Sequence, residues 1–251
     1  MPELVNVKVE EHIAIVTLNN PPLNLLGPKI LNEMIVEFNR LSADEQVRVI
    51  ILTGAGDRAF CGGGDRRITA VVTPQTLEAG FLLGRTMYDT IRDCAVPVIG
   101  AINGPAIGGG TALAASCDIL IASERAVFAL PEVNVGMWPQ FRYLARLVPE
   151  LKMRRMVYTG QRLTAQEMQR FGSIECVVAH EELMPTAMRL AREIAEKNSF
   201  IVRLYKKALN SVENLGVKES LPVELNYIRQ LVELHDAQNI RQSFQDKGTQ
   251  T

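Results

Sequence analysis

The stretch that decides the fold is Asn103-Gly104-Pro105-Ala106-Ile107-Gly108-Gly109-Gly110, which follows an apolar run at 97–102. The run predicts a strand buried on both faces, and the glycines permit positive φ and close approach of the backbone to a ligand. A second glycine cluster, 59–65, follows the apolar run 47–52 in the same way. Two clusters at strand ends can present converging amides to one oxygen, as in an oxyanion hole, although glycine also serves tight turns.

Apolar periodicity around the two clusters predicts an α/β fold. Strand-like and helix-like segments alternate as far as residue 130, which is typical of βαβ units with right-handed crossovers. A β-hairpin at 4–18 is expected before them, because apolar residues dominate both sides of Glu11-His12. The other expected elements in this half are helices at 28–41, 75–93 and 111–115, and strands at 47–52, 97–102 and 118–122, followed by a further apolar stretch at 127–130.

The chain changes character after about residue 140, where helical periodicity dominates. Only 174–178 has the pattern of a strand. The expected helices are 141–148, 153–158, 165–171, 183–197, 202–212 and one or two within 217–247. We therefore expect a core domain at 1–197 and a helical C-terminal module at 198–251.

Composition narrows the class of protein. The 251 residues are 47% hydrophobic, with a formal net charge of -1. Near-zero charge argues against electrostatic binding to nucleic acid or membrane. No apolar run reaches the ~20 residues that span a bilayer, and the N-terminus lacks the apolar region of a secretory signal, so we expect a cytoplasmic protein. The cysteines are widely spaced, which predicts free thiols and no metal site; they are Cys61, Cys94, Cys117 and Cys176.

Common nucleotide and nucleophile motifs are missing from the glycine clusters. The cluster at 103–110 lacks the GxGxxG spacing, and neither cluster ends in the Gly-Lys-Ser/Thr of a phosphate loop. The chain also contains no GxSxG elbow. These absences argue against a dinucleotide site, a phosphate loop and an α/β-hydrolase serine.

Several blocks resemble, in order and spacing, the signatures of the crotonase superfamily, the enoyl-CoA hydratase/isomerase family. They are Asn20-Pro21-Pro22-Leu23-Asn24, the clusters 59–65 and 103–110, Cys117-Asp118, 128–132 with Val135-Gly136, and 163–167. The resemblance covers residues 3–248. It implies a spiral of ββα units with a helical C-terminal trimerisation module, an acyl-CoA substrate, no cofactor or metal, and a homotrimer or hexamer.

The resemblance also implies site residues. The oxyanion amides would be those of Gly64 and Gly109, and the carbonyl they bind would belong to a thioester that passes through an enolate. Two-glutamate hydratases carry one carboxylate where this chain has Ala112 and a second at the position of Glu132. The substrate-binding set implied by the family consists of Phe60, Gly64, Asp65, Arg66, Gly109, Trp138 and Lys247.

A single catalytic carboxylate favours one reaction of the family over the others. Moving a double bond requires one base that shifts one proton, whereas adding water usually needs a base and an acid. The retained Glu132 thus favours an enoyl-CoA isomerase. Gln140 supplies no acid where other relatives have an aspartate, and Glu78 or Asp89 remain candidates for a replacement. A hydratase, a hydrolase, a decarboxylase, and an inactive CoA- or RNA-binding scaffold stay open as alternatives.

Overall fold

The computed structural model describes residues 3–65, 67, 73–234, 238–240 and 242. The chain divides into two compact units, Met1–Ile194 and Ala195–Thr251. The first unit is a mixed α/β structure and the second is helical, so the expected fold class is confirmed. None of the helices in the described part has the length and apolar character that crossing a bilayer requires.

A six-stranded sheet organises the first unit, with the strand order β1-β2-β3-β4-β6-β9. The first two strands form the predicted antiparallel hairpin, and each later neighbour pairs in parallel. The central strands are buried on both faces because helices cover them, which explains their continuous apolar runs. The strands are β1 (Val5–Glu10), β2 (Ile13–Leu18), β3 (Val49–Gly54), β4 (Val98–Ile102), β6 (Ile119–Ser123) and β9 (Cys176–Val178).

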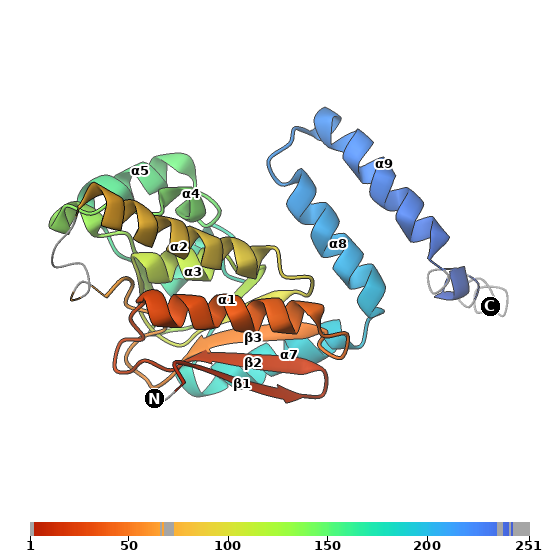
Figure 1. The fold of residues 1–251 in the computed structure, drawn as a ribbon, viewed down its shortest axis with the longest axis horizontal. Helices are drawn as coiled ribbons and strands as arrows, with labels where there is room; N and C mark the ends of the chain where they lie inside the picture. The colour runs from red at the N-terminus through yellow and green to blue at the C-terminus, as the bar shows by residue number, and fades with distance from the viewer. Residues whose placement is uncertain (1–2, 66, 68–72, 235–237, 241, 243–251) are drawn as a thin grey trace. The chain divides into compact units, whose positions relative to one another are not determined.

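Two long helices lie side by side in this unit (Figure 1). Helix α1 (Pro28–Ala43) begins with a proline and buries an apolar stripe: Ile30, Leu31, Met34, Phe38 and Leu41. Helix α2 (Pro74–Arg92) begins after Thr73, whose hydroxyl accepts the Thr76 N–H at 3.2 Å. Both helices were predicted from periodicity. The structure places their facing sides around the cavity described below.

A second, three-stranded sheet was not predicted. Strand β5 (Ala106–Ile107) pairs in parallel with β7 (Val127–Ala129), which pairs antiparallel with β8 (Leu163–Thr164). Helix α3 (Gly109–Ala115) starts directly after β5. The Thr111 hydroxyl lies 2.6 Å from the Ala106 carbonyl oxygen and 2.9 Å from that of Ala129. This small sheet therefore ties the second glycine cluster to the chain that leads into Glu132.

The rest of the first unit consists of short helices and turns. They are η1 (Glu132–Val135), α4 (Phe141–Leu144), α5 (Glu150–Thr159), α6 (Ala165–Arg170), η2 (His180–Glu182) and α7 (Leu183–Ala195). In the second unit, α8 (Ser199–Val212) packs against α9 (Val217–Glu233), and the hydroxyls of Ser211 and Tyr227 lie 2.8 Å apart. The predicted helical stretch beyond residue 234 falls mostly outside the described residues.

Candidate active site

The two glycine clusters run beside each other. The Cys61 N–H donates to the Pro105 carbonyl at 3.2 Å, and the Ile107 N–H donates to the Cys61 carbonyl at 2.9 Å. A Cβ atom on Gly63 would lie 2.6 Å from the Ile107 oxygen and 3.3 Å from the Gly109 nitrogen. Gly63 also has a φ of 89°, which favours glycine. Close backbone contact is therefore the physical reason for glycine in the first cluster.

Two buried asparagines fix these clusters to the strand ends. The Asn24 amide donates to the carbonyls of Ala55 and Ala59 at 3.0 and 2.9 Å. The Asn103 side chain accepts the Gly54 N–H at 3.2 Å and donates to the Gly54 carbonyl at 3.0 Å. These contacts give the blocks at 20–24 and 103–110 a structural role, because they hold the loop that leads into the first cluster.

Among the described residues, no acceptor lies on the N–H groups of Gly64 and Gly109. Hydrogen bonds on either side of Gly64, from Leu26 to the Gly63 carbonyl and from Asp65 to the Leu26 carbonyl, are both 2.8 Å long and leave the Gly64 N–H unused. Gly109 is the first residue of α3, so its N–H has no partner within the helix. Within the described part of the chain neither N–H has an acceptor, and both glycines line one cavity. Together they offer two donors to an anionic oxygen.

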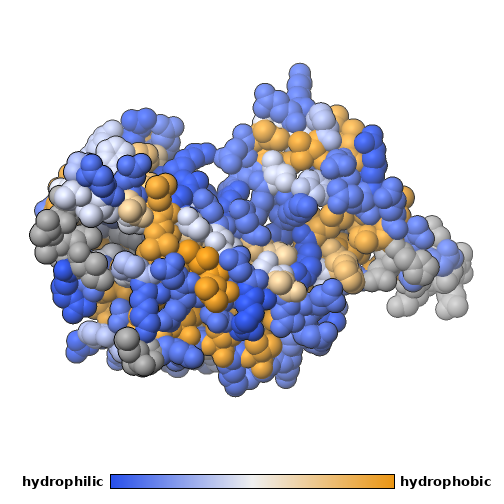
Figure 2. All heavy atoms as spheres, in the orientation of Figure 1, coloured by the Kyte–Doolittle hydropathy of each residue, from blue (hydrophilic) through white to orange (hydrophobic). Residues whose placement is uncertain are grey.

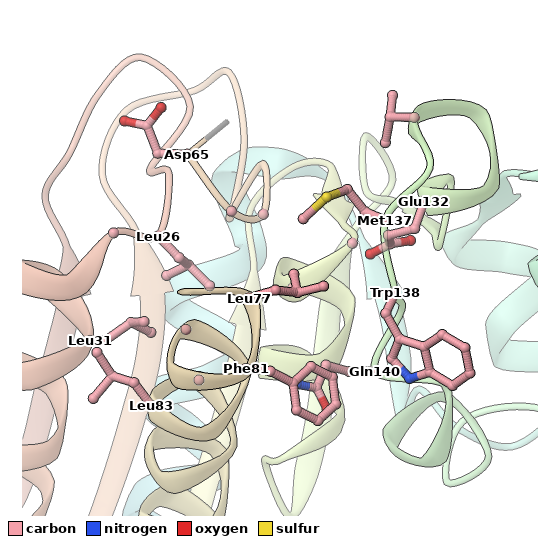
Figure 3. Close-up of a pocket in the computed structure, with 18 of the residues that line it drawn as sticks. Leu26, Leu31, Asp65, Leu77, Phe81, Leu83, Glu132, Met137, Trp138 and Gln140 are labelled. Carbon is pink, nitrogen blue, oxygen red and sulfur yellow. The ribbon is translucent and has the colours of Figure 1, made fainter. Parts of the chain in front are cut away.

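The cavity has a volume of about 750 Å³. Its walls are the start of α1, the two glycine clusters, the inner side of α2 and the segment 131–140. Leu77 and Phe81 project from α2 on the side that faces Glu132 and Met137 (Figure 3). In the described residues no group of three or more His, Cys, Asp or Glu side chains is placed to hold a metal ion.

Glu132 combines burial with an incomplete set of hydrogen bonds. Its Oε2 atom is buried and has no partner in the described structure. A Cβ on Gly108 would lie 2.8 Å from Oε1, so glycine at 108, with a φ of 56°, makes room for the carboxylate. Burial raises the pKa of Glu132, against a smaller opposite contribution from its own backbone N–H. A raised pKa makes a carboxyl group a stronger base, which suits reversible proton transfer.

Replacing Glu132 with glutamine is expected to stabilise the fold, and more so as the pH rises. Because burial raises the pKa in the native state, the native protein binds that proton more tightly than the unfolded chain does. The stability that protonation of Glu132 gives is thus present at acidic pH and lost as the pH rises through the raised pKa. Glutamine has no such charge, so the thermal midpoint of the variant should exceed the parental one by more at pH 8 than at pH 4. A gain of ~1 kcal/mol corresponds to about 2–4 °C for a chain of this size.

The control is Glu78→Gln, because Glu78 lies on the exposed side of α2 and outside the cavity. Thermal unfolding of the parent and both variants at several pH values measures the effect. A midpoint difference for Glu132→Gln that stays constant or shrinks towards high pH would contradict the buried-charge explanation.

Tyr88 is a site residue that the sequence analysis missed. Its hydroxyl donates to the Gly109 carbonyl at 3.0 Å, and its ring lies 5.2 Å from the ring of Tyr143. Tyr88 is buried, lines the cavity, and has its pKa raised by that burial, so the phenol keeps its proton. It therefore braces the start of α3 beside the open N–H.

The candidate replacement acids do not reach the cavity. Both oxygens of Asp89 are occupied, one by the Tyr143 hydroxyl at 2.5 Å and the other by Arg85 Nε at 2.8 Å. Neither Asp89 nor Glu78 lines the cavity. Ala112 is buried and also does not line it. Burial raises the pKa of the Cys61 thiol to about 12, so this cysteine is no nucleophile either.

Of the remaining expected site residues, some line the cavity, one lies in the core, and two lie outside the described residues. Asp65 lines the cavity, but its carboxylate holds Arg67 at 2.7 and 2.9 Å, and that contact lowers the pKa of Asp65. Trp138 lines the cavity with 62% of its surface exposed. Phe60 is fully buried in the core and does not line the cavity, while Arg66 and Lys247 lie outside the described residues.

Sequence comparison decides the family. A model of the family described as enoyl-CoA hydratase/isomerase matches residues 8–251. The chain belongs to this family. The enoyl-CoA hydratase/isomerase assignment confirms the crotonase resemblance, and it spans both compact units.

Known members resemble this enoyl-CoA hydratase/isomerase family protein over most of their length. It is 34% identical over 253 residues to the short-chain-enoyl-CoA hydratase of Clostridium acetobutylicum, covering 98% of this chain and 96% of that protein. It is 36% identical over 220 residues to the (7aS)-7a-methyl-1,5-dioxo-2,3,5,6,7,7a-hexahydro-1H-indene-carboxyl-CoA hydrolase of Rhodococcus jostii, covering 87% and 85%. The crystal structure of an enoyl-CoA hydratase from Bacillus anthracis matches with a TM-score of 0.92 and 30% identity, covering 98% and 97%.

Proposed function

We propose that this protein is an enoyl-CoA isomerase in which Glu132 is the single proton-transfer group and the Gly64 and Gly109 amides bind the thioester oxygen. The observation that carries the proposal is the pairing, in one cavity, of two open N–H groups with one carboxyl group of raised pKa. Asp65 is the other carboxylate among the described lining residues, and Arg67 holds it ionised. A second general acid is therefore missing from the described cavity wall.

The proposed reaction moves one proton and one double bond. Glu132 removes a proton from C2 of a 3-enoyl thioester, and the electron pair of that C–H bond forms the C1=C2 bond of an enolate. The negative oxygen accepts hydrogen bonds from the two glycine N–H groups. When the carbonyl forms again, C2=C3 becomes the double bond, and the former C3=C4 electrons take the same proton at C4. Atoms and charge balance without water or an oxidant.

Hydrolysis and hydration are the competing candidates, and the names of similar proteins favour them. The two relatives at 34% and 36% identity are named a hydratase and a hydrolase of CoA thioesters. Each reaction would use the same two N–H donors. In each, water would add to a carbon atom of the bound thioester beside Glu132. The products distinguish these reactions without further assumptions.

The deciding experiment incubates the protein with a panel of acyl-CoA thioesters and follows products by mass spectrometry and absorbance. An unchanged mass with a new conjugated-thioester absorbance supports the isomerase. A gain of one water identifies a hydratase, free CoA identifies a hydrolase, and loss of carbon dioxide identifies a decarboxylase. CoA binding without turnover of any thioester would favour the inactive scaffold.

We also propose that the chain assembles as a homotrimer or hexamer. One side of α9 presents four apolar residues at helical spacing, Leu221, Leu225, Ile228 and Val232, with 41–55% of each side chain exposed. Apolar surface is visible on the C-terminal helices in Figure 2. An exposed apolar stripe of this kind favours burial against another copy.

Sedimentation at micromolar concentration should give the mass of three or six copies of the 27.8 kDa chain. The double change Leu225→Lys with Ile228→Lys places charges in the stripe and should lower that mass. Arg229→Glu, next to the stripe, is the matched control for a charge change on the same helix. A parental protein that sediments as a single chain would rule out the assembly.

A further inference from the structure

The cavity side of α2 carries glycine where a side chain would fit. Leu77, Gly80, Phe81, Gly84 and Tyr88 all line the cavity, and steps of three or four residues place them on one face of the helix. Gly80 and Gly84 are inside a helix that runs from Pro74 to Arg92. Glycine in a helix interior is destabilising relative to alanine, because it loses more conformational freedom on folding.

Neither backbone geometry nor packing against the described residues requires these two glycines. A Cβ on Gly84 would meet one described atom within 4 Å, Tyr88 Cε2, at an ordinary contact distance of 3.8 Å. A Cβ on Gly80 would meet no described atom within 4 Å. Neither glycine is among those with positive φ. Within the described residues, therefore, neither packing nor backbone conformation accounts for glycine at these two positions.

Other features, which do not involve Gly80 or Gly84, mark the same cavity as a ligand site. Gly64 and Gly109, whose N–H groups have no acceptor among the described residues, line it, and the buried Oε2 atom of Glu132 lacks a partner in the described structure. Figure 3 shows Phe81 on α2 and Trp138 on the opposite segment, with Leu31 and Leu83 on the wall nearest α1. The walls near the glycines are mostly aromatic or aliphatic, so the group that fills this end of the cavity is apolar.

We propose that the acyl group of the substrate is carbocyclic and lies against the bare backbone of α2 at Gly84 and Gly80. A linear acyl chain is about one methylene wide and would pass a helix that carried alanine at both positions. A ring is broader and gains van der Waals contact by approaching the helix backbone directly. The inference deepens the proposed function, since it takes the thioester from that proposal and adds the shape of its acyl group.

Binding of unreactive thioesters tests the shape without turnover. Trp138 is the single tryptophan of the chain and lines the cavity, so its fluorescence reports occupancy. Octanoyl-CoA and cyclohexylacetyl-CoA are the probes, because their acyl groups have the same number of carbons and neither carries a double bond. The parent should bind cyclohexylacetyl-CoA at least ten-fold more tightly than octanoyl-CoA. Gly84→Ala should reduce this preference and Gly84→Leu should abolish it, since one misplaced methylene in an apolar pocket changes affinity about 10–200-fold.

The control is Thr86→Ala on the exposed side of the same helix, outside the cavity. It should raise the thermal midpoint, as Gly84→Ala should, but leave the preference for the cyclic thioester unchanged. Equal affinity of the parent for both thioesters would overturn the inference, and so would a cyclic preference that survives Gly84→Leu in a folded variant. A parent that binds with the expected preference but fails to move double bonds would refute the isomerase and leave the carbocyclic acyl group standing.

Discussion

Glu132→Gln is expected to lower turnover by about 10²–10⁴-fold while the fold and the affinity for acyl-CoA survive. Glutamine keeps the size of the side chain and can still hydrogen-bond, but it cannot accept the proton from the substrate. Because burial raises the pKa of Glu132, the parental rate should also rise with pH through that raised pKa, as the base becomes ionised. Steady-state rates across pH, with Kd measured separately, check both expectations.

Asp65→Asn is the matched comparison, since it removes the other described carboxylate of the cavity wall. If loss of negative charge alone impaired the reaction, both variants would suffer similarly and both would keep the pH dependence. If Glu132 is the base, only its replacement removes the rising limb of the pH profile. Parental activity in Glu132→Gln would place the base elsewhere, and no other described carboxyl group in the cavity is suited to that role.

Gly109→Pro is expected to reduce turnover by at least roughly a hundred-fold, because it removes one of the two N–H donors. Gly109 is the first residue of α3, a position at which proline fits the helix backbone. The added Cβ atom, however, would lie 2.8 Å from the Tyr88 hydroxyl and 3.3 Å from Leu26 Cδ1. Loss of activity in the proline variant alone would therefore mix two causes.

Gly109→Ala separates them, because alanine brings the same Cβ atom and keeps the N–H. Adding Tyr88→Phe to each variant removes the hydroxyl that the Cβ would meet. In the Tyr88→Phe background, the turnover number of Gly109→Ala divided by that of Gly109→Pro gives an upper limit for the contribution of the Gly109 N–H, for which ~3 kcal/mol is typical. It is an upper limit because proline also restricts the backbone of Gly108, whose φ is 56° and ψ is -120°. Equal turnover in that pair, with both proteins folded, would remove the Gly109 N–H from the mechanism.

The strands and long helices of the core could be predicted because burial imposes a period on the sequence. Strands of two residues, such as β5 and β8, are too short to show an alternation of apolar and polar residues. The small sheet that leads into Glu132 was missed for that reason. Glu132 itself was proposed from its surrounding block, because one glutamate after a proline has no local signature. Its burial and its unpartnered oxygen became visible only in three dimensions.

Tyr88 shows a second limit of sequence reasoning. Its spacing in the sequence predicts only a further buried residue of α2. No neighbouring residue in the sequence indicates a contact with Gly109. Asp89, its neighbour, was a candidate acid from the sequence, but the helix turns it towards Arg85 and Tyr143 and away from the cavity. Neighbouring positions on a helix face different directions, so a pattern can identify the face but not the partners that fold against it.

The small sheet separates the proposed reacting groups from the proposed contact with the acyl group. The Gly108 N–H donates to the Ala129 carbonyl at 2.8 Å, so Gly109 and Glu132, the proposed oxyanion donor and base, are joined by one short hydrogen-bonded segment. The glycines at 80 and 84 are on a different helix. If the acyl group contacts α2 as proposed, substitution of Gly80 or Gly84 changes the acyl preference and leaves Gly109 and Glu132 in place, whereas a residue inserted between 106 and 132 displaces Glu132 relative to Gly109.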